Sequence, residues 1–133
     1  MCIRDRYSAP DDLDVVSIDV DGQDFWIWMA LKFTPVLYVI EYNSNFPSLH
    51  QTCTVQFDPH FRWDGSKYYG ASLGALVKLG RDKSYTLVYA NTVNAFFVHD
   101  EYLGNPEDFV AENLNRPMDM HPPDPLNRRW IDV

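Results

Sequence analysis

Two neighbouring apolar segments of the sequence each end in acidic or amide side chains. Asp19 and Asp21 close the segment DVVSIDVDG, and Glu41 and Asn43 close the segment VLYVIEYN. Carboxylates are costly to bury without partners, so at the ends of buried strands they are expected to face water, a ligand or a metal. Residues two apart in an extended strand point to the same side. The pattern therefore predicts that a site begins where the two strands end.

The elements that position these residues follow from the hydrophobic periodicity. Residues 15–20 and 36–42 are typical of buried strands, and residues 25–32 form a short helix that is apolar nearly all round. Residues 71–79 have the period of an amphipathic helix, with Ser72 as N-cap and Gly80 as its stop. The sequence NTVN joins two further strands, residues 85–90 and 95–99, as an antiparallel pair. Residues 45–69 lack a period and read as a long loop.

Strands that alternate with helices predict parallel pairing through right-handed crossovers. We therefore expect an α/β fold with a partial Rossmann-like, doubly wound sheet, mostly parallel, with the antiparallel hairpin at its C-terminal edge. In such sheets ligands bind outside the carboxyl ends of the strands. Asp19, Asp21, Glu41 and Asn43 would converge at this edge.

Composition limits the remaining possibilities. The 133 residues are 46% hydrophobic, enough for one domain with a core, and the net charge of −8 argues against nucleic acid or an anionic membrane as partner. Two cysteines form neither a disulfide framework nor a zinc signature, which favours a reducing, cytoplasmic setting. Residues 1–7 look like a translated sequencing adapter, so we treat them as a non-native leader. The domain then spans residues 8–103, and residues 104–133 form a Pro-rich extended tail.

Four segments together resemble the FkbM-like family of S-adenosylmethionine-dependent methyltransferases. They are SIDVDGQDFWIW, VIEYNSNFP, FRWDGSKYYGASLGALVKLG and VNAFFVHDE, and they extend over residues 13–101. The IDVDG motif is similar to the end of the family's fourth strand, EYN looks like the end of its fifth, and the hairpin looks like its final antiparallel pair. The resemblance implies a Rossmann-like fold and methyl transfer from S-adenosylmethionine.

The family's glycine-rich first loop and the acidic residue that ends its second strand have no counterpart here, so no cofactor-binding residue is assigned. The chain looks like the C-terminal half of the enzyme, a fragment that we expect to be inactive alone and to self-associate through its open sheet edge. By the resemblance, Asp19 and Asp21 are catalytic, and Glu41 and Asn43 flank a small-molecule or saccharide-type acceptor. Asp19 would act either as a base or as the ligand of a divalent metal.

Other interpretations stay open at this point. IDVDG also resembles the Asp-x-Asp-Gly opening of haloacid-dehalogenase-type phosphohydrolases, in which Asp19 would be the nucleophile and Asp21 the acid or base, with Mg²⁺. Asp21-Gly22 and Asp24 also suit an ordinary turn and a helix start. Trp63 and Asp64 belong either to a tight turn or to a lid over the acceptor. The four histidines show no metal-ligand spacing.

Overall fold

A computed structural model describes residues 10–133, so the predicted leader, residues 1–7, lies outside the described part. The sheet strands are β1 (Val15–Ile18), β2 (Leu37–Glu41), β4 (Tyr85–Ala90) and β5 (Asn94–His99), and the helices are α2 (Asp24–Ala30), α3 (Leu73–Asp82) and α4 (Ala111–Leu114). Two short strands, β3 (Cys53–Thr54) and β6 (Ile131–Asp132), pair with each other. Two 3-10 turns, Asp100–Tyr102 and Pro106–Asp108, follow β5.

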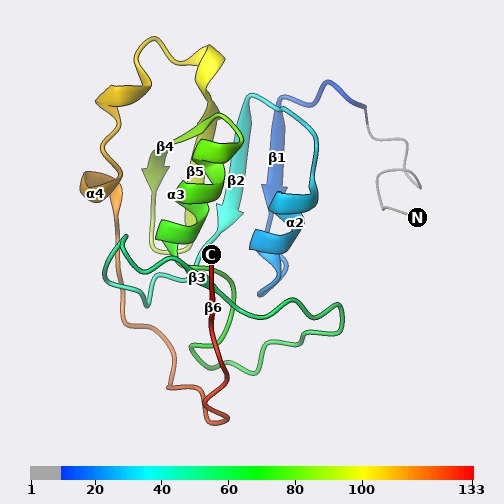
Figure 1. The fold of residues 1–133 in the computed structure, drawn as a ribbon, viewed down its shortest axis with the longest axis vertical. Helices are drawn as coiled ribbons and strands as arrows, with labels where there is room; N and C mark the ends of the chain where they lie inside the picture. Colours follow the sequence, from blue (N-terminus) through cyan, green and yellow to red (C-terminus); the bar gives the residue numbers. More distant parts are fainter. Residues whose placement is uncertain (1–9) are drawn as a thin grey trace.

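The main sheet has the strand order β1-β2-β5-β4 (Figure 1). Only β1 and β2 are parallel, because β5 pairs antiparallel with β2 on one side and with β4 on the other. The prediction of a mostly parallel, doubly wound sheet was therefore wrong. The antiparallel hairpin was predicted correctly, but its second strand inserts between β2 and β4, so two of the three pairings in the sheet are antiparallel.

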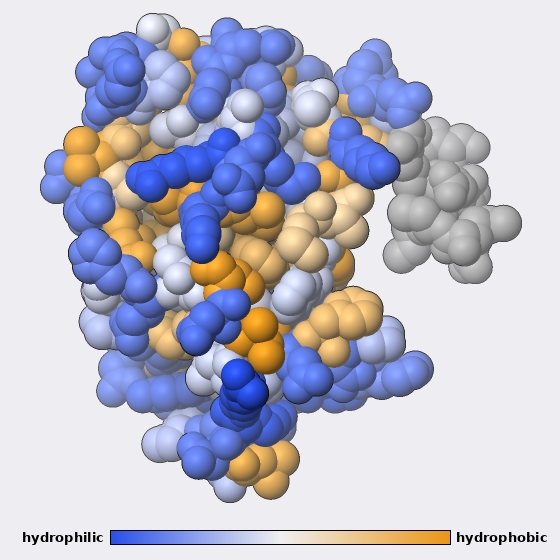
Figure 2. All heavy atoms as spheres, viewed as in Figure 1, coloured by the Kyte–Doolittle hydropathy of each residue, from blue (hydrophilic) through white to orange (hydrophobic). Residues whose placement is uncertain are grey.

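Helices α2 and α3 cover one face of this sheet (Figure 1). Tyr38 and Ile40 of β2 point to that face and are fully buried, whereas Leu37 and Val39, at the alternate positions, are only partly buried. Trp28 of α2 lies at the centre of the core, with its ring against those of Tyr38, Tyr85 and Phe97. On the face that carries the helices, hydrophilic residues dominate the outline and apolar residues show through in the middle (Figure 2).

The predicted helix over residues 71–79 is present as α3 and continues past its predicted stop. Ser72 caps it as expected, since its hydroxyl accepts a hydrogen bond from the Ala75 amide at 3.2 Å. Gly80 lies within the helix, where a Cβ atom would come 3.1 Å from the Tyr85 carbonyl oxygen. The glycine therefore serves a close approach to β4 and β5, and the chain leaves the helix only at Lys83 and Ser84, the latter with φ of 66°.

The long loop and the later part of the tail lie together below the carboxyl ends of β1 and β2, whereas the first part of the tail, with α4, lies beside β4 (Figure 1). The tail runs along the loop and returns to it through the pairing of β6 with β3. Trp130 of the tail packs against Phe46 and Tyr68 of the loop, with ring centroids 4.8 and 4.9 Å away. Among residues 10–133, no helix is both long and apolar enough to cross a membrane.

Candidate functional site

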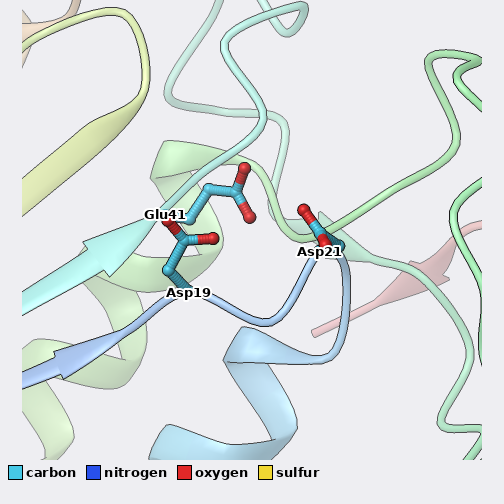
Figure 3. Close-up of side chains that lie close together, drawn as sticks. All are labelled: Asp19, Asp21 and Glu41. Carbon is cyan, nitrogen blue, oxygen red and sulfur yellow. The ribbon is translucent and has the colours of Figure 1, made fainter.

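The parallel register of β1 and β2 brings the first two carboxylates together. Ser17 pairs with Val39, so Asp19 and Glu41, each two positions further on, lie side by side and on the same face of the sheet. This is the face opposite to α2 and α3. Figure 3 shows the two side chains next to each other at the ends of their strands, with Asp21 across from Glu41.

A tight turn between β1 and α2 supplies the third carboxylate. Asp21 adopts the left-handed conformation with φ of 54°, and Gly22 follows with φ of 140°. The buried Asp24 side chain holds this turn, because its two oxygens accept hydrogen bonds from the amides of Val20 (3.0 Å) and Gly22 (3.1 Å). Asp24 was predicted to lie at the start of a helix, and it does so. Its side chain also stabilises the preceding turn and so holds Asp21 in position.

Asp19, Asp21 and Glu41 form a carboxylate cluster in which one oxygen of each lies within 4.8 Å of the others. No ion pair within residues 10–133 involves any of the three. Burial, followed by the charges of Asp24, Asp19 and Asp21, raises the pKa of Glu41 to about 8. Oxygen Oε2 of Glu41 is buried and has no hydrogen-bond partner among residues 10–133. Glu41 therefore keeps its proton to higher pH than an ordinary glutamate does, and a cation placed among these groups would favour its ionised form.

These groups predict that the protein loses stability as the pH rises from about 5 to 8.5. Burial raises the pKa of Asp24 to about 6, and Glu41 reaches about 8, both above the values in an unfolded chain. The unfolded state therefore releases these protons at lower pH than the folded state does, so their contribution to stability is complete below about pH 4 and is lost as the pH passes 6 and 8. Urea unfolding with a chelator present measures this. Between pH 7 and 8.5 the free energy of unfolding should fall less steeply with pH in Glu41→Gln than in the wild type. An equal slope in the two proteins would contradict the raised pKa of Glu41.

A cavity of about 260 Å³ opens beside the carboxylate cluster. Asp21 and Glu41 form one wall, and Tyr42, Trp63 and Tyr69 contribute aromatic rings. Val93, together with Met120 and His121 of the tail, completes the lining. The tail is held there by hydrogen bonds from the Met118 amide to the Ser44 carbonyl at 2.8 Å and from the Met120 amide to the Asn45 side chain at 2.7 Å.

The other predicted site residues differ in where the structure places them. Trp63 lines the cavity, whereas Asp64 is not part of the lining and forms an ion pair with Arg128 at 2.5 Å. Asn43 is buried, and its amide makes four hydrogen bonds, to Lys67, Tyr69 and twice to Asn45. These bonds tie the loop to the end of β2 and leave Asn43 no free group for a ligand.

Sequence reasoning missed the residues that close the cavity. Tyr69 follows Tyr68 in a segment that has no hydrophobic periodicity, so the sequence does not indicate which of the two tyrosines faces the cavity. His121 lies between prolines, far along the chain from the strand ends, and reaches the cavity only because the tail folds back. The Asn43 and Asn45 pair, which holds both the loop and the tail, is the one sequence signal that points to this contact.

The carboxylate cluster fits a divalent cation by its chemistry, because Mg²⁺ and Ca²⁺ prefer carboxylate oxygens. Asp19, Asp21 and Glu41 would hold such an ion, and the unpartnered oxygen of Glu41 would gain a partner. Bound there, the ion would supply charge that activates a hydroxyl group. Exposed acidic groups are common without an ion, so the cluster alone is not evidence for one.

Comparison of the chain with protein-family models, with curated proteins and with solved structures gives no match in any of the three.

Proposed function

We propose that the chain carries the acceptor side of an S-adenosylmethionine-dependent methyltransferase, in which the carboxylate cluster receives the proton that the acceptor releases. The observation that carries this proposal is the position of Asp19, Asp21 and Glu41 at the ends of β1 and β2, directly beside an aromatic-lined cavity. The FkbM-like motifs in the sequence support it as well. The sheet departs from the parallel arrangement that the resemblance implies, so the proposal rests on the site and the motifs.

The protein's own contribution to such a reaction is positioning, proton transfer and exclusion of water. Trp63 and Tyr69 would hold the acceptor against the carboxylates, and Met120 and His121 would cover it from the tail side. Asp19, with its side chain next to Glu41, would take the proton. S-adenosylmethionine supplies an electrophilic methyl group when bound, and no residue of this chain is assigned to its adenosine.

The test is transfer of a labelled methyl group from S-adenosylmethionine to a panel of alcohols and amines, with this chain and with any longer reading frame that contains it. We expect Asp19→Asn to lower kcat by roughly 10²–10⁴-fold, because general base catalysis contributes about that much. Binding of S-adenosylmethionine, measured by calorimetry, should stay nearly unchanged. Asp82→Asn, an exposed carboxylate at the end of α3, is the control. Full turnover in Asp19→Asn would remove Asp19 from the mechanism.

A magnesium-dependent phosphohydrolase is the second candidate, favoured by the fit of the carboxylate cluster to a divalent ion. Within residues 10–133, no lysine or arginine lines the adjoining cavity, although phosphate groups are usually bound by such residues. We therefore rank it lower. Hydrolysis of p-nitrophenyl phosphate that requires Mg²⁺ and is lost in Asp19→Asn, together with no methyl transfer, would reverse this order.

A further inference from the structure

The cavity beside the carboxylate cluster has acidic groups on one wall, and no lysine or arginine of residues 10–133 lies opposite them. Asp21 and Glu41 contribute to its lining, and Asp19 lies within 4.8 Å of both. In the described part of the chain, none of the three carboxylates takes part in an ion pair. A ligand that enters the cavity therefore meets uncompensated negative charge.

Aromatic rings, together with Val93 and Met120, form the rest of the wall, and the rings contact one another. Trp63 lies against Tyr69 with ring centroids 5.4 Å apart, and His121 contacts both rings edge-on at 4.9 and 5.6 Å. The Trp63 indole donates a hydrogen bond to the Ser66 carbonyl at 2.8 Å, which holds the ring in place. Faces of tryptophan and tyrosine attract cations, most strongly where water is displaced. The aromatic composition of this wall therefore favours the same kind of ligand as the carboxylate wall, for an independent reason.

From these two features we propose that the cavity binds an organic ammonium group, with Asp21 and Glu41 as counter-charges and Trp63 and Tyr69 as the ring wall. This deepens the proposed function, on which it rests in one respect: the bound amine is the methyl acceptor. The ammonium group passes one proton to Asp19, and its nitrogen lone pair then forms a bond to the methyl carbon. The carbon–sulfur bond of the sulfonium donor breaks, and its electron pair stays on sulfur as a neutral thioether.

A neutral acceptor such as a saccharide fits these observations less well. Hydroxyl groups can accept hydrogen bonds from a protonated carboxyl or donate to an ionised one, but they bring no positive charge to Asp19, Asp21 and Glu41. An ammonium group brings that positive charge directly. The amine acceptor therefore replaces the small-molecule or saccharide-type acceptor as the more specific proposal.

Benzylamine and benzyl alcohol test this with the chain as it stands, because the two probes match in size and differ in charge. Binding is followed through the amide shifts of residues around the cavity in two-dimensional NMR, at pH 7.5 with a chelator present. We expect benzylamine to bind about tenfold more tightly than benzyl alcohol, the effect of roughly one cation–π contact with a counter-charge. Equal affinity, tighter binding of the alcohol, or no saturable binding of the amine would each overturn the proposal.

Variants locate the binding. The pair Asp21→Asn with Glu41→Gln should reduce the preference for the amine to less than about twofold, and Trp63→Leu should weaken amine binding about fivefold. Asp82→Asn and Phe57→Leu, an exposed carboxylate and an exposed ring outside this cavity, are the matched controls and should leave both affinities unchanged. A preference retained in the Asp21/Glu41 pair would place the amine elsewhere and overturn the proposal.

The binding measurement and the methyl-transfer assay can fail separately. Amine binding at this cavity without methyl transfer in any reading frame would refute the proposed function and leave an amine-binding site. Methyl transfer to alcohols, with benzylamine neither bound nor methylated, would refute the amine proposal and leave the proposed function intact.

Discussion

Replacement of Asp24 by alanine should lower the free energy of unfolding by about 2 kcal/mol and abolish the preference for benzylamine. Asp24 is fully buried, and its two carboxyl oxygens accept hydrogen bonds from the amides of Val20 and Gly22. Alanine leaves these two amide donors unpaired, and an unpaired buried donor costs about 1–3 kcal/mol of stability. Part of this cost is offset, because the substitution also removes a carboxyl group that is desolvated in the folded protein. Asp21 then loses the turn that directs it toward Glu41. Urea unfolding at pH 6 and the two-probe NMR titration measure both effects.

Asp82→Ala is the control for Asp24→Ala, because its side chain is exposed at the end of α3 and should change stability by less than about 0.5 kcal/mol. Asp24→Asn separates the two roles of the carboxyl group. Asparagine removes the charge but keeps one acceptor oxygen, so it should cost less stability than alanine and still disturb the turn. If Asp24→Ala keeps the wild-type preference for benzylamine over benzyl alcohol, the position of Asp21 does not depend on the hydrogen bonds of Asp24.

The carboxylate cluster could be predicted in large part from the sequence because the information is local. Apolar β-branched runs before Asp19 and Glu41 identify two strands, and their ends lie together whenever those strands are neighbours in parallel. Asp21-Gly22 was also readable as a turn. What the sequence did not reveal is that Asp24, the first residue of α2, holds this turn through hydrogen bonds that its carboxyl group accepts from the β1–α2 connection.

The order of the strands and the path of the tail could not be predicted from the sequence, for a different reason. Alternating strands and helices favour parallel pairing, but β4 and β5 follow α3 without a helix between them, and either one could have been placed against β2. The choice of β5 depends on side-chain packing across the sheet, such as Tyr38 and Ile40 of β2 opposite Phe97 and Ala95. Likewise, His121 and Met120 reach the cavity through contacts between residues some 75 positions apart, which leave no periodic pattern.

The close approach of α3 to the loop over residues 49–51 leads to the other large expected effect. Gly74→Ala should lower the free energy of unfolding by about 3 kcal/mol, because a Cβ atom at Gly74 would lie 2.2 Å from the Leu49 carbonyl oxygen and 2.8 Å from that of Gln51. Both are backbone atoms and cannot rotate away. The Ser72 hydroxyl also ties the helix start to this loop, since it donates to the Gln51 carbonyl at 2.5 Å and accepts from the Cys53 amide at 3.1 Å. Equilibrium urea unfolding of both proteins measures the difference.

Gly104→Ala is the matched control, because apart from its chain neighbours no atom of residues 10–133 lies within 4 Å of its Cβ position, and its effect should stay within about 0.5 kcal/mol. In an unpacked helix, glycine to alanine would instead stabilise by about 1 kcal/mol. The sign of the change in the free energy of unfolding of Gly74→Ala therefore shows whether α3 packs against the loop. Stabilisation would mean that α3 and the loop are not in contact in solution. Since the same loop continues to Trp63 and Tyr69, the ring wall of the cavity would then lack the support on which the amine proposal depends.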